Sequence, residues 1–171
     1  IHGFEPGAAD LVFSRFGVMF FEDPGAAFRN LLAALRPGGR VTFLCWQGLD
    51  RNPWMQVPIA AIAPLVELPP PPAPGTPGPM AFADDERVRG LLADAGFEAV
   101  RATPHESEVS VGGLGSPETA AEFMLKIGPA ARAVRASGAE DLSPLRDAIA
   151  NALAAYQRDG GIMLDAVSYT H

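Results

Sequence analysis

The chain has 171 residues, 48% of them apolar, which is enough to bury the core of a domain and argues against intrinsic disorder. Its 13 basic and 20 acidic side chains give a formal net charge of −7, so no broad basic surface neutralises phosphates and nucleic acid is not expected as a partner. The single cysteine, Cys45, excludes an internal disulfide framework and a thiolate metal site, and we expect a cytoplasmic protein.

The first predicted element is a strand at residues 9–16. Its apolar run at 11–13, Leu-Val-Phe, is typical of a strand buried on both faces, as in a parallel sheet covered by helices. Asp23 is a suitable N-cap and Pro24 a favoured first helical residue, and the apolar side chains after them fall on one helical face. The sequence therefore predicts a strand and a helix that packs on it.

A return turn and a second strand come next. The Pro-Gly-Gly sequence at 37–39 predicts the end of the helix, and residues 40–46 predict another buried strand. The three elements form a βαβ unit over residues 1–47, whose crossover should be right-handed. Prolines are dense from 48 to 80, and because proline has a fixed φ and no N–H we expect a long covering loop there.

Regular structure returns over residues 81–111. Asp84 is a candidate N-cap, the apolar residues after it have helical spacing, and Gly96 predicts the end of that helix. Residues 97–103 predict a third strand, prolonged towards the end of this segment. The acidic run at 84–86 is better explained as charge in the first helical turn than as a metal site.

The segment at 112–160 is predicted to be helical. Ser-Pro pairs at 116–117 and 143–144 each predict the start of a helix, and the glycines at 160–161 predict the end of the second helix. We expect these helices to form an insertion, or cap, before a last strand within residues 161–171.

The predicted elements and short motifs follow one another in this order along the chain: a strand, SRFGVMFFEDP, an amphipathic helix, LRPGG, a strand ending in CW, and a helix ending in LLADAGF before another strand. The series resembles the second half of a class I S-adenosylmethionine-dependent methyltransferase, from residue 1 to about residue 167. The resemblance implies an α/β, Rossmann-like sheet, mostly parallel with one antiparallel strand near an edge. The chain would carry strands four to seven, with a helical insertion before the last strand, as one partial domain.

The resemblance also implies what the chain lacks. The first three strands, the glycine-rich loop after strand one and the acidic residue that holds the ribose hydroxyls have no counterpart. Residues 112–115, Gly-Gly-Leu-Gly, follow a possible strand but have neither the glycine fingerprint nor an acidic residue about 20 positions on. We therefore expect a fragment that binds S-adenosylmethionine weakly and is inactive alone.

The stretch after the first strand is the expected cofactor contact. The resemblance places Ser14, Arg15 and Phe16 against the methionine part of S-adenosylmethionine, with Gly17 and Met19 nearby. Ligands do bind at the carboxyl ends of strands in open α/β sheets. The alternative is that the aromatic residues and Met19 only cover the strand end as core, although Arg15 is harder to explain in that way.

Methyl transfer from a sulfonium needs mainly alignment of acceptor and methyl group in a dry pocket, so no signature catalytic residue is expected. His105, after the third strand, is the weak candidate for a general base, and the alternative is an exposed histidine at a strand end. Cys45 is expected to be a small buried apolar residue. The three histidines are scattered, so no metal site is expected.

A small-molecule acceptor pocket is the remaining expectation. Trp46, at the exit of the second strand, and Trp54 are candidates for its walls, or they are aromatic cover over the sheet edge. Met124, in the helical segment at 116–157, faces either this pocket or the core. No span of about 20 apolar residues is present, so a membrane partner is not expected.

Both ends of the sequence suggest a fragment. The chain starts with Ile, and its last residues, Val-Ser-Tyr-Thr-His at 167–171, depart from the family pattern and resemble a translated sequencing adapter. They are left out of the fold prediction. In the family the first strand pairs with a strand that is absent here, so Leu11 to Phe16 would form an open apolar edge through which the chain self-associates or folds poorly.

Two other functions remain open. One is half of a nucleotide-cofactor oxidoreductase, since doubly wound sheets look alike in outline, although the chain has no Tyr-x-x-x-Lys pair. The other is a non-catalytic, Rossmann-like binding or interaction fold.

Overall fold

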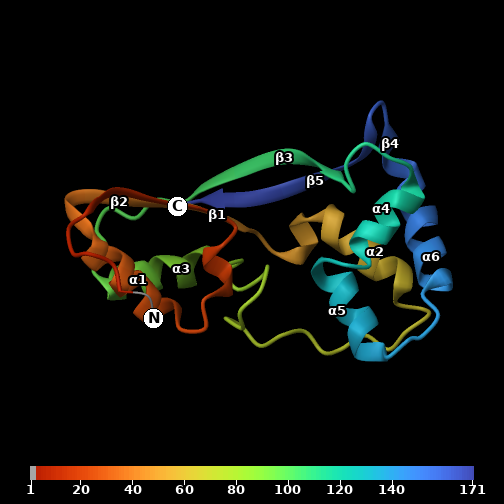
Figure 1. Cartoon of the computed structure of the whole chain (residues 1–171), viewed down its shortest axis with the longest axis horizontal. Coiled ribbons are helices and arrows are strands. Elements are labelled where there is room, and N and C mark those ends of the chain that lie inside the picture. Colours follow the sequence, from red (N-terminus) through yellow and green to blue (C-terminus); the bar gives the residue numbers. More distant parts are fainter. Residues whose placement is uncertain (1–2) are drawn as a thin grey trace. The chain divides into compact units, whose positions relative to one another are not determined.

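The computed structural model describes residues 3–171 and divides them into two compact units (Figure 1). Unit 1 consists of the described residues up to Gly48 together with Ala73–His105 and Val167–His171. Unit 2 consists of Leu49–Pro72 and Glu106–Ala166. The segment expected as a covering loop, residues 48–80, is thus shared between the two units.

The strands form one mixed sheet in the order β1-β2-β5-β3, with β4 (Gln157–Arg158) beside β5. Strands β1 (Ala9–Arg15) and β2 (Leu35–Trp46) are parallel, whereas β5 (Gly161–Thr170) runs antiparallel to β2. Strand β3 (Thr103–Val111) is the neighbour of β5, as Figure 1 shows. The expected α/β class, with a parallel pair and an antiparallel strand near an edge, is therefore observed.

The core of unit 1 lies between one face of β1 and β2 and the helices α1 (Pro24–Ala34) and α3 (Asp85–Ala95). Phe28, on α1, is fully buried and its ring lies 5.5 Å from that of Phe43 on β2. Phe82 precedes α3 in the chain, and its ring centroid lies 5.9 Å from that of Phe28. This aromatic cluster holds both helices against the same sheet face.

Both expected caps of these helices are confirmed. An Asp23 carboxylate oxygen accepts a hydrogen bond from the Ala26 N–H at 2.8 Å, and Asp84 accepts one from the Arg87 N–H at 3.2 Å. Gly96 ends α3 with φ +98°, a left-handed conformation that glycine adopts at little cost. Local capping chemistry therefore fixes these helix ends.

Two expectations about the first strands need correction. β1 is not buried on both faces: Leu11 and Phe13 are 56% and 60% exposed. Helix α1 ends at Ala34 rather than at the Pro-Gly-Gly turn, because Leu35 already has an extended backbone (φ −80°, ψ 140°) and pairs with Ala9. β2 consequently starts five residues before the expected position and contains the turn glycines.

The proline-rich segment is also not a loop throughout. A short 3-10 turn, Leu49–Arg51, leads into helix α2 (Pro53–Ile62). Pro53 stands in the first turn, where its missing N–H has no helical partner to lose, while Pro58 costs one internal hydrogen bond. Pro58 and Ile62 are buried, so burial of the apolar helix face outweighs that loss.

The third strand lies later than expected. Residues 97–102 are not in a strand, because the Phe97 N–H closes the end of α3 on the Leu92 carbonyl at 3.0 Å and Ala99 has φ +54°. The Arg89 guanidinium then binds the Val100 carbonyl at 3.1 Å. Strand β3 begins only at Thr103, once these contacts to α3 are complete.

Unit 2 is a helical cluster with strand segments beside it. Its helices are α2, α4 (Pro117–Met124), α5 (Gly128–Ser137) and α6 (Ser143–Leu153), so the expected helical insertion contains three helices. Small side chains line their contacts: the fully or nearly fully buried residues include Ala120, Ala121, Ala130 and Ala133. The hairpin β4–β5 follows α6, so Gly160 and Gly161 turn a hairpin and do not end the helix.

The last five residues belong to the sheet. Their backbone continues β5 along β2, and the Phe43 and His171 backbones exchange two hydrogen bonds of 3.0 and 2.9 Å. The His171 side chain is only 1% exposed and stacks on Phe43 at 4.9 Å between ring centroids. The end of the chain, left out of the fold prediction, therefore completes the core of unit 1.

The glycine pair after β3 offers a test of packing in unit 2. A Cβ on Gly112 (φ +76°) would lie 2.7 Å from the Ala120 Cα, whereas one on Gly113 (φ +74°) would meet nothing within 4 Å. Gly112→Ala should cost about 2–4 kcal/mol, from the left-handed backbone plus overpacking against α4, and Gly113→Ala only about 1 kcal/mol. Urea unfolding of both variants measures the difference, and equal losses would contradict this packing.

His171 should make stability depend on pH. Burial lowers its pKa below the ordinary value of 6.5, and Arg89 adds to this, while Asp85, with one carboxylate oxygen 3.9 Å from Nδ1, opposes it. The unfolded chain therefore binds a proton that the folded chain resists, and stability should fall as the pH drops below about 6.5. Urea unfolding at pH 7.5 and 5.5 checks this, with His171→Phe as the control that should lose part of the dependence. An unchanged dependence in that variant would contradict the assignment.

Candidate functional site

The turn that follows β1, residues Ser14 to Gly17, has an unusual backbone. Phe16 has φ +60°, a conformation that bulky residues rarely adopt. The turn is held at both ends: the Ser14 hydroxyl accepts a hydrogen bond from the Gly17 N–H at 3.3 Å, and the Phe16 N–H donates to the Leu44 carbonyl at 3.1 Å. Strain of this kind costs roughly 1–3 kcal/mol and clusters at ligand-binding positions.

An aromatic stack fixes this turn to the end of the neighbouring strand. The Phe16 ring lies 3.9 Å from the Trp46 ring at an angle of 9°. Because β1 and β2 are parallel, their carboxyl ends lie at the same edge of the sheet, which is where open α/β sheets bind ligands. The structure therefore brings together two of the expected site residues, one from each strand.

Met19 supports the stack from the core. The Met19 sulfur accepts a hydrogen bond from the backbone N–H of Trp46 at 3.4 Å, and the Met19 carbonyl accepts one from the Gly78 N–H at 3.0 Å. The side chain is only 1% exposed. Met19 thus lies beneath the turn, as the core alternative had it, and Phe20 beside it is exposed.

Arg15 is the charged group of this turn. Its side chain is exposed and makes no hydrogen bond or ion pair with any residue of the described chain, 3–171. A guanidinium offers five donors in a planar fork that suits carboxylate or phosphate groups. The turn therefore combines an anion-binding side chain with an aromatic surface.

The other expected site residues belong to other elements of the chain. Trp54, near the start of α2, packs partly against the core of unit 2, and Met124 is fully buried in that core. The structure does not bring these two together with Trp46 inside one unit. His105 is an exposed residue of β3. Their roles in an acceptor pocket or as a base stay predictions.

Cys45 is the buried apolar residue that the sequence predicted. It is fully buried, and its thiol donates to the Phe82 carbonyl at 3.6 Å. Burial, with the nearby Asp85 charge, raises the pKa of this thiol to about 12. At neutral pH it is a thiol and not a nucleophilic thiolate.

The described part of the chain has neither a metal-binding cluster nor a membrane-spanning helix. Residues 3–171 contain no group of three or more His, Cys, Asp or Glu side chains placed to hold a metal ion. None of the helices described has the length and apolar character needed to cross a membrane.

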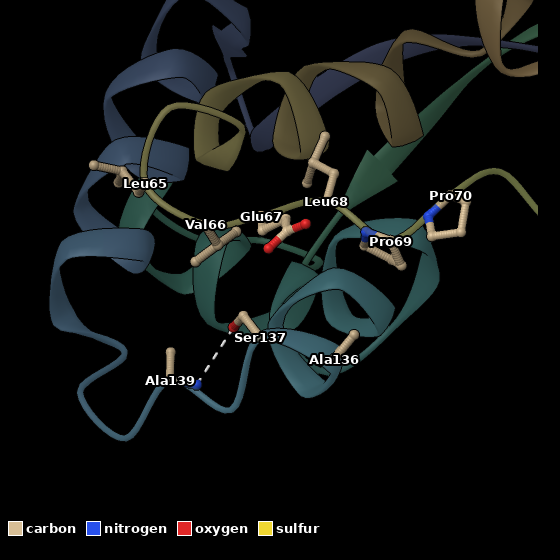
Figure 2. A pocket seen from close by; sticks show the side chains of 9 residues that line it. All are labelled: Leu65, Val66, Glu67, Leu68, Pro69, Pro70, Ala136, Ser137 and Ala139. Atoms are coloured by element: carbon tan, nitrogen blue, oxygen red, sulfur yellow. Dashed lines mark hydrogen bonds between the residues drawn. The ribbon is translucent and has the colours of Figure 1, made fainter.

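Sequence reasoning missed a cavity in unit 2, of about 520 Å³, shown in Figure 2. It lies between the chain after α2, from Leu65 to Pro70, and the end of α5, near Ser137. Glu67 is its one ionisable lining residue, and the Ser137 hydroxyl is occupied by bonds to the Val134 carbonyl and the Ala139 N–H. The apolar residues before the proline run were the available signal.

A family model described as "Methyltransferase domain" matches residues 1–43, the stretch that contains β1, the Ser14 to Gly17 turn and most of β2. No curated protein matches the chain.

Solved structures give weaker similarities. Phosphoethanolamine N-methyltransferase 2 of Haemonchus contortus, in complex with phosphomonomethylethanolamine and S-adenosylhomocysteine, is 14% identical, with a TM-score of 0.40. The [4+2]-cyclase SpnF is 17% identical, with a TM-score of 0.37. The alignments cover 99% and 98% of this chain but only 34% and 52% of those two chains, so the protein spans about a third and about half of their lengths.

These TM-scores are too low to identify a family, so the similarity to methyltransferases comes from the family model alone. That model covers the segment with the strained turn and the first strands of the sheet. Residues 1–43 are thus similar to a methyltransferase domain, and the resemblance seen in the sequence is confirmed over that stretch.

Proposed function

We propose that this protein is the carboxyl-terminal part of an S-adenosylmethionine-dependent methyltransferase that acts on a small molecule. The observation that carries the proposal is the strained Phe16 turn, stacked on Trp46 at the carboxyl ends of two parallel strands, within the matched segment. A bulky side chain in this backbone conformation is energetically unfavourable, and contact of the phenylalanine with a ligand would explain why it is present.

The sheet supports the same proposal. We assign β1, β2, β3 and β5 to strands four, five, six and seven of the methyltransferase sheet. Three observations support this assignment: β1 and β2 are parallel, β5 is antiparallel to β2, and β5 lies between β2 and the last strand of the order, β3. The helices α4, α5 and α6 precede β5 and form the proposed insertion.

The residues of the turn fit one part of the cofactor. We assign Arg15 to the carboxylate of the methionine part, and the faces of the Phe16 and Trp46 rings to the positively charged sulfur, since ring faces attract cations. Ser14 and Gly17 hold the turn in place, and Met19 supports it from below. When bound, S-adenosylmethionine supplies an activated methyl group.

The chain's own residues would then act by positioning. Holding the reactants in line and excluding water can contribute about 7–11 kcal/mol without an acid or a base. We keep His105 as the candidate base for a hydroxyl or amine acceptor, and Trp46, Trp54 and Met124 as candidates for the acceptor pocket. The proposal includes a cytoplasmic location and no nucleic-acid or membrane partner.

The remaining part of the cofactor site is proposed to lie outside this sequence. The 171 residues contain no glycine-rich cofactor loop, so we expect the chain alone to bind S-adenosylmethionine weakly and to be inactive. The alternatives are a non-catalytic binding fold and half of a nucleotide-cofactor oxidoreductase.

Calorimetric titration with S-adenosylhomocysteine tests the function. It should be carried out on this chain and on a form extended upstream by the first three strands. Binding by the extended form alone is the expected result. A folded extended form that binds no S-adenosylhomocysteine would contradict the proposal and favour the binding fold, and binding of a nicotinamide cofactor instead would favour the oxidoreductase.

The contribution of the turn is tested in the extended form. Phe16→Ala should weaken S-adenosylhomocysteine binding about tenfold, because it removes one ring of the stack and its contact with the ligand. Phe20→Ala is the matched control: it removes an exposed phenylalanine four residues further on and should leave binding unchanged. Equal affinities of the two variants would remove the turn from the cofactor site.

A further inference from the structure

The cavity of unit 2 has the size of a ligand-binding site. Its volume is about 520 Å³, and sites for small molecules have volumes of roughly 300–1,000 Å³. One wall is the chain after α2, residues 65–70, and the other is the end of α5 together with Ala139. Both walls belong to unit 2, so the cavity is formed within this unit.

Hydrogen bonds and core contacts hold the walls of the cavity in place. The Val66 N–H donates to the Ile62 carbonyl at 3.2 Å, where the first wall leaves α2. At the other end of this wall the Arg132 guanidinium, on α5, donates to the Pro70 carbonyl at 2.8 Å. Val66 and Ala139 also pack against the core of unit 2. A site that is held in shape before binding loses little conformational entropy when a ligand enters.

Most of the lining is apolar. Leu65 and Leu68 are 50% and 37% exposed, so a ligand in the cavity would remove apolar surface from water. The Ser137 hydroxyl already has its two hydrogen bonds within the chain. A ligand of this cavity therefore needs an apolar body. The apolar lining residues are Leu65, Val66, Leu68, Pro69, Pro70, Ala136 and Ala139.

Glu67 gives the cavity its charge. Figure 2 shows the carboxylate directed into the space between the two walls. The side chain forms no hydrogen bond or ion pair with any residue of the described chain, 3–171. Arg132 and Arg135, the arginines of α5, do not line the cavity. The lining thus offers one negative charge and no positive charge.

We propose that this cavity is a binding site for a small organic cation, an amine with an apolar body. Its ammonium group pairs with the Glu67 carboxylate, and its apolar body covers Leu65 and Leu68. A neutral molecule of the same shape loses the ion pair, and an anion is repelled. The proposal does not rest on the proposed function, because it concerns binding to unit 2 and no methyl transfer.

The exposure of Glu67 limits how strong the charge preference can be. The side chain is exposed, so water screens its attraction for a cation. Ion pairs of this kind change an affinity by a factor of about five at most. The preference for a cation over a matched neutral molecule should therefore be about fivefold, with the apolar contacts supplying the remaining affinity.

Three indole compounds of similar shape test the proposal. Tryptamine is a cation at neutral pH, tryptophol is neutral and indole-3-acetate is an anion, and each carries a two-carbon side chain on the same ring. NMR titration of the labelled whole chain should show tryptamine binding about five times more tightly than tryptophol, and indole-3-acetate more weakly than both. The amide signals from Leu65 to Leu68 and from Ala136 to Ala139 should shift.

Two matched variants test the role of the carboxylate. Glu67→Gln removes the charge and keeps the size of the side chain, so tryptamine should bind about fivefold more weakly, as tightly as tryptophol does. Tryptophol binding should be unchanged. Glu122→Gln is the control, because Glu122 is an exposed residue of α4 that does not line the cavity. It should keep the preference for tryptamine.

A third variant tests the location. Ala136 is an exposed residue of α5 that lines the cavity, so Ala136→Trp places a large side chain in it without disturbing the buried core. This variant should lose the binding of tryptamine and tryptophol alike. Circular dichroism and thermal unfolding establish that all three variants are folded.

Four outcomes would overturn the proposal. They are the absence of tryptamine binding up to about 10 mM, equal affinities of the wild-type chain for tryptamine and tryptophol, equal losses in Glu67→Gln and Glu122→Gln, and tryptamine binding that survives in Ala136→Trp. None of these measurements involves S-adenosylhomocysteine, so failure of this proposal and failure of the proposed function are separate results.

Discussion

The parallel pairing of β1 with β2 is the contact on which the rest of unit 1 depends. It places Val12 and Phe43 on the face that α1 and α3 cover, and it brings the two strand ends to the same edge, so that the Phe16 and Trp46 rings meet. One register thus determines both the core and the candidate site.

Features set by local chemistry could be predicted from the sequence. The caps at Asp23 and Asp84 and the stop at Gly96 depend on residues close in the chain, and all three are observed. The sequence does not predict helix α2, because the dense prolines favour an irregular segment, whereas the burial of its apolar face in unit 2 stabilises the helix. The start of β3 depends on contacts with α3 from Phe97 to Val100, which no local pattern reveals.

The candidate site was predictable only in part. The SRFG stretch indicates the turn. The left-handed conformation of Phe16 and its stack on Trp46, however, arise from the pairing of two strands, and these two residues are 30 positions apart in sequence. The sequence places Met19 near the ligand, but the residue lies in the core, because the 3-10 turn Val18–Phe20 directs it inward. The cavity at Glu67 joins segments about 70 residues apart, Glu67 and Ser137, so the apolar residues before the proline run indicate only one of its two walls.

The spacing of the Phe16 and Trp46 rings has a mechanical consequence. At 3.9 Å and nearly parallel, the rings are in contact, so nothing can enter between them. The stacked pair therefore offers a ligand only the outer face of each ring and the ring edges. One ring belongs to the strained turn after β1 and the other to the end of β2. A ligand that displaces one ring would therefore also move the other, and with it the end of the second strand.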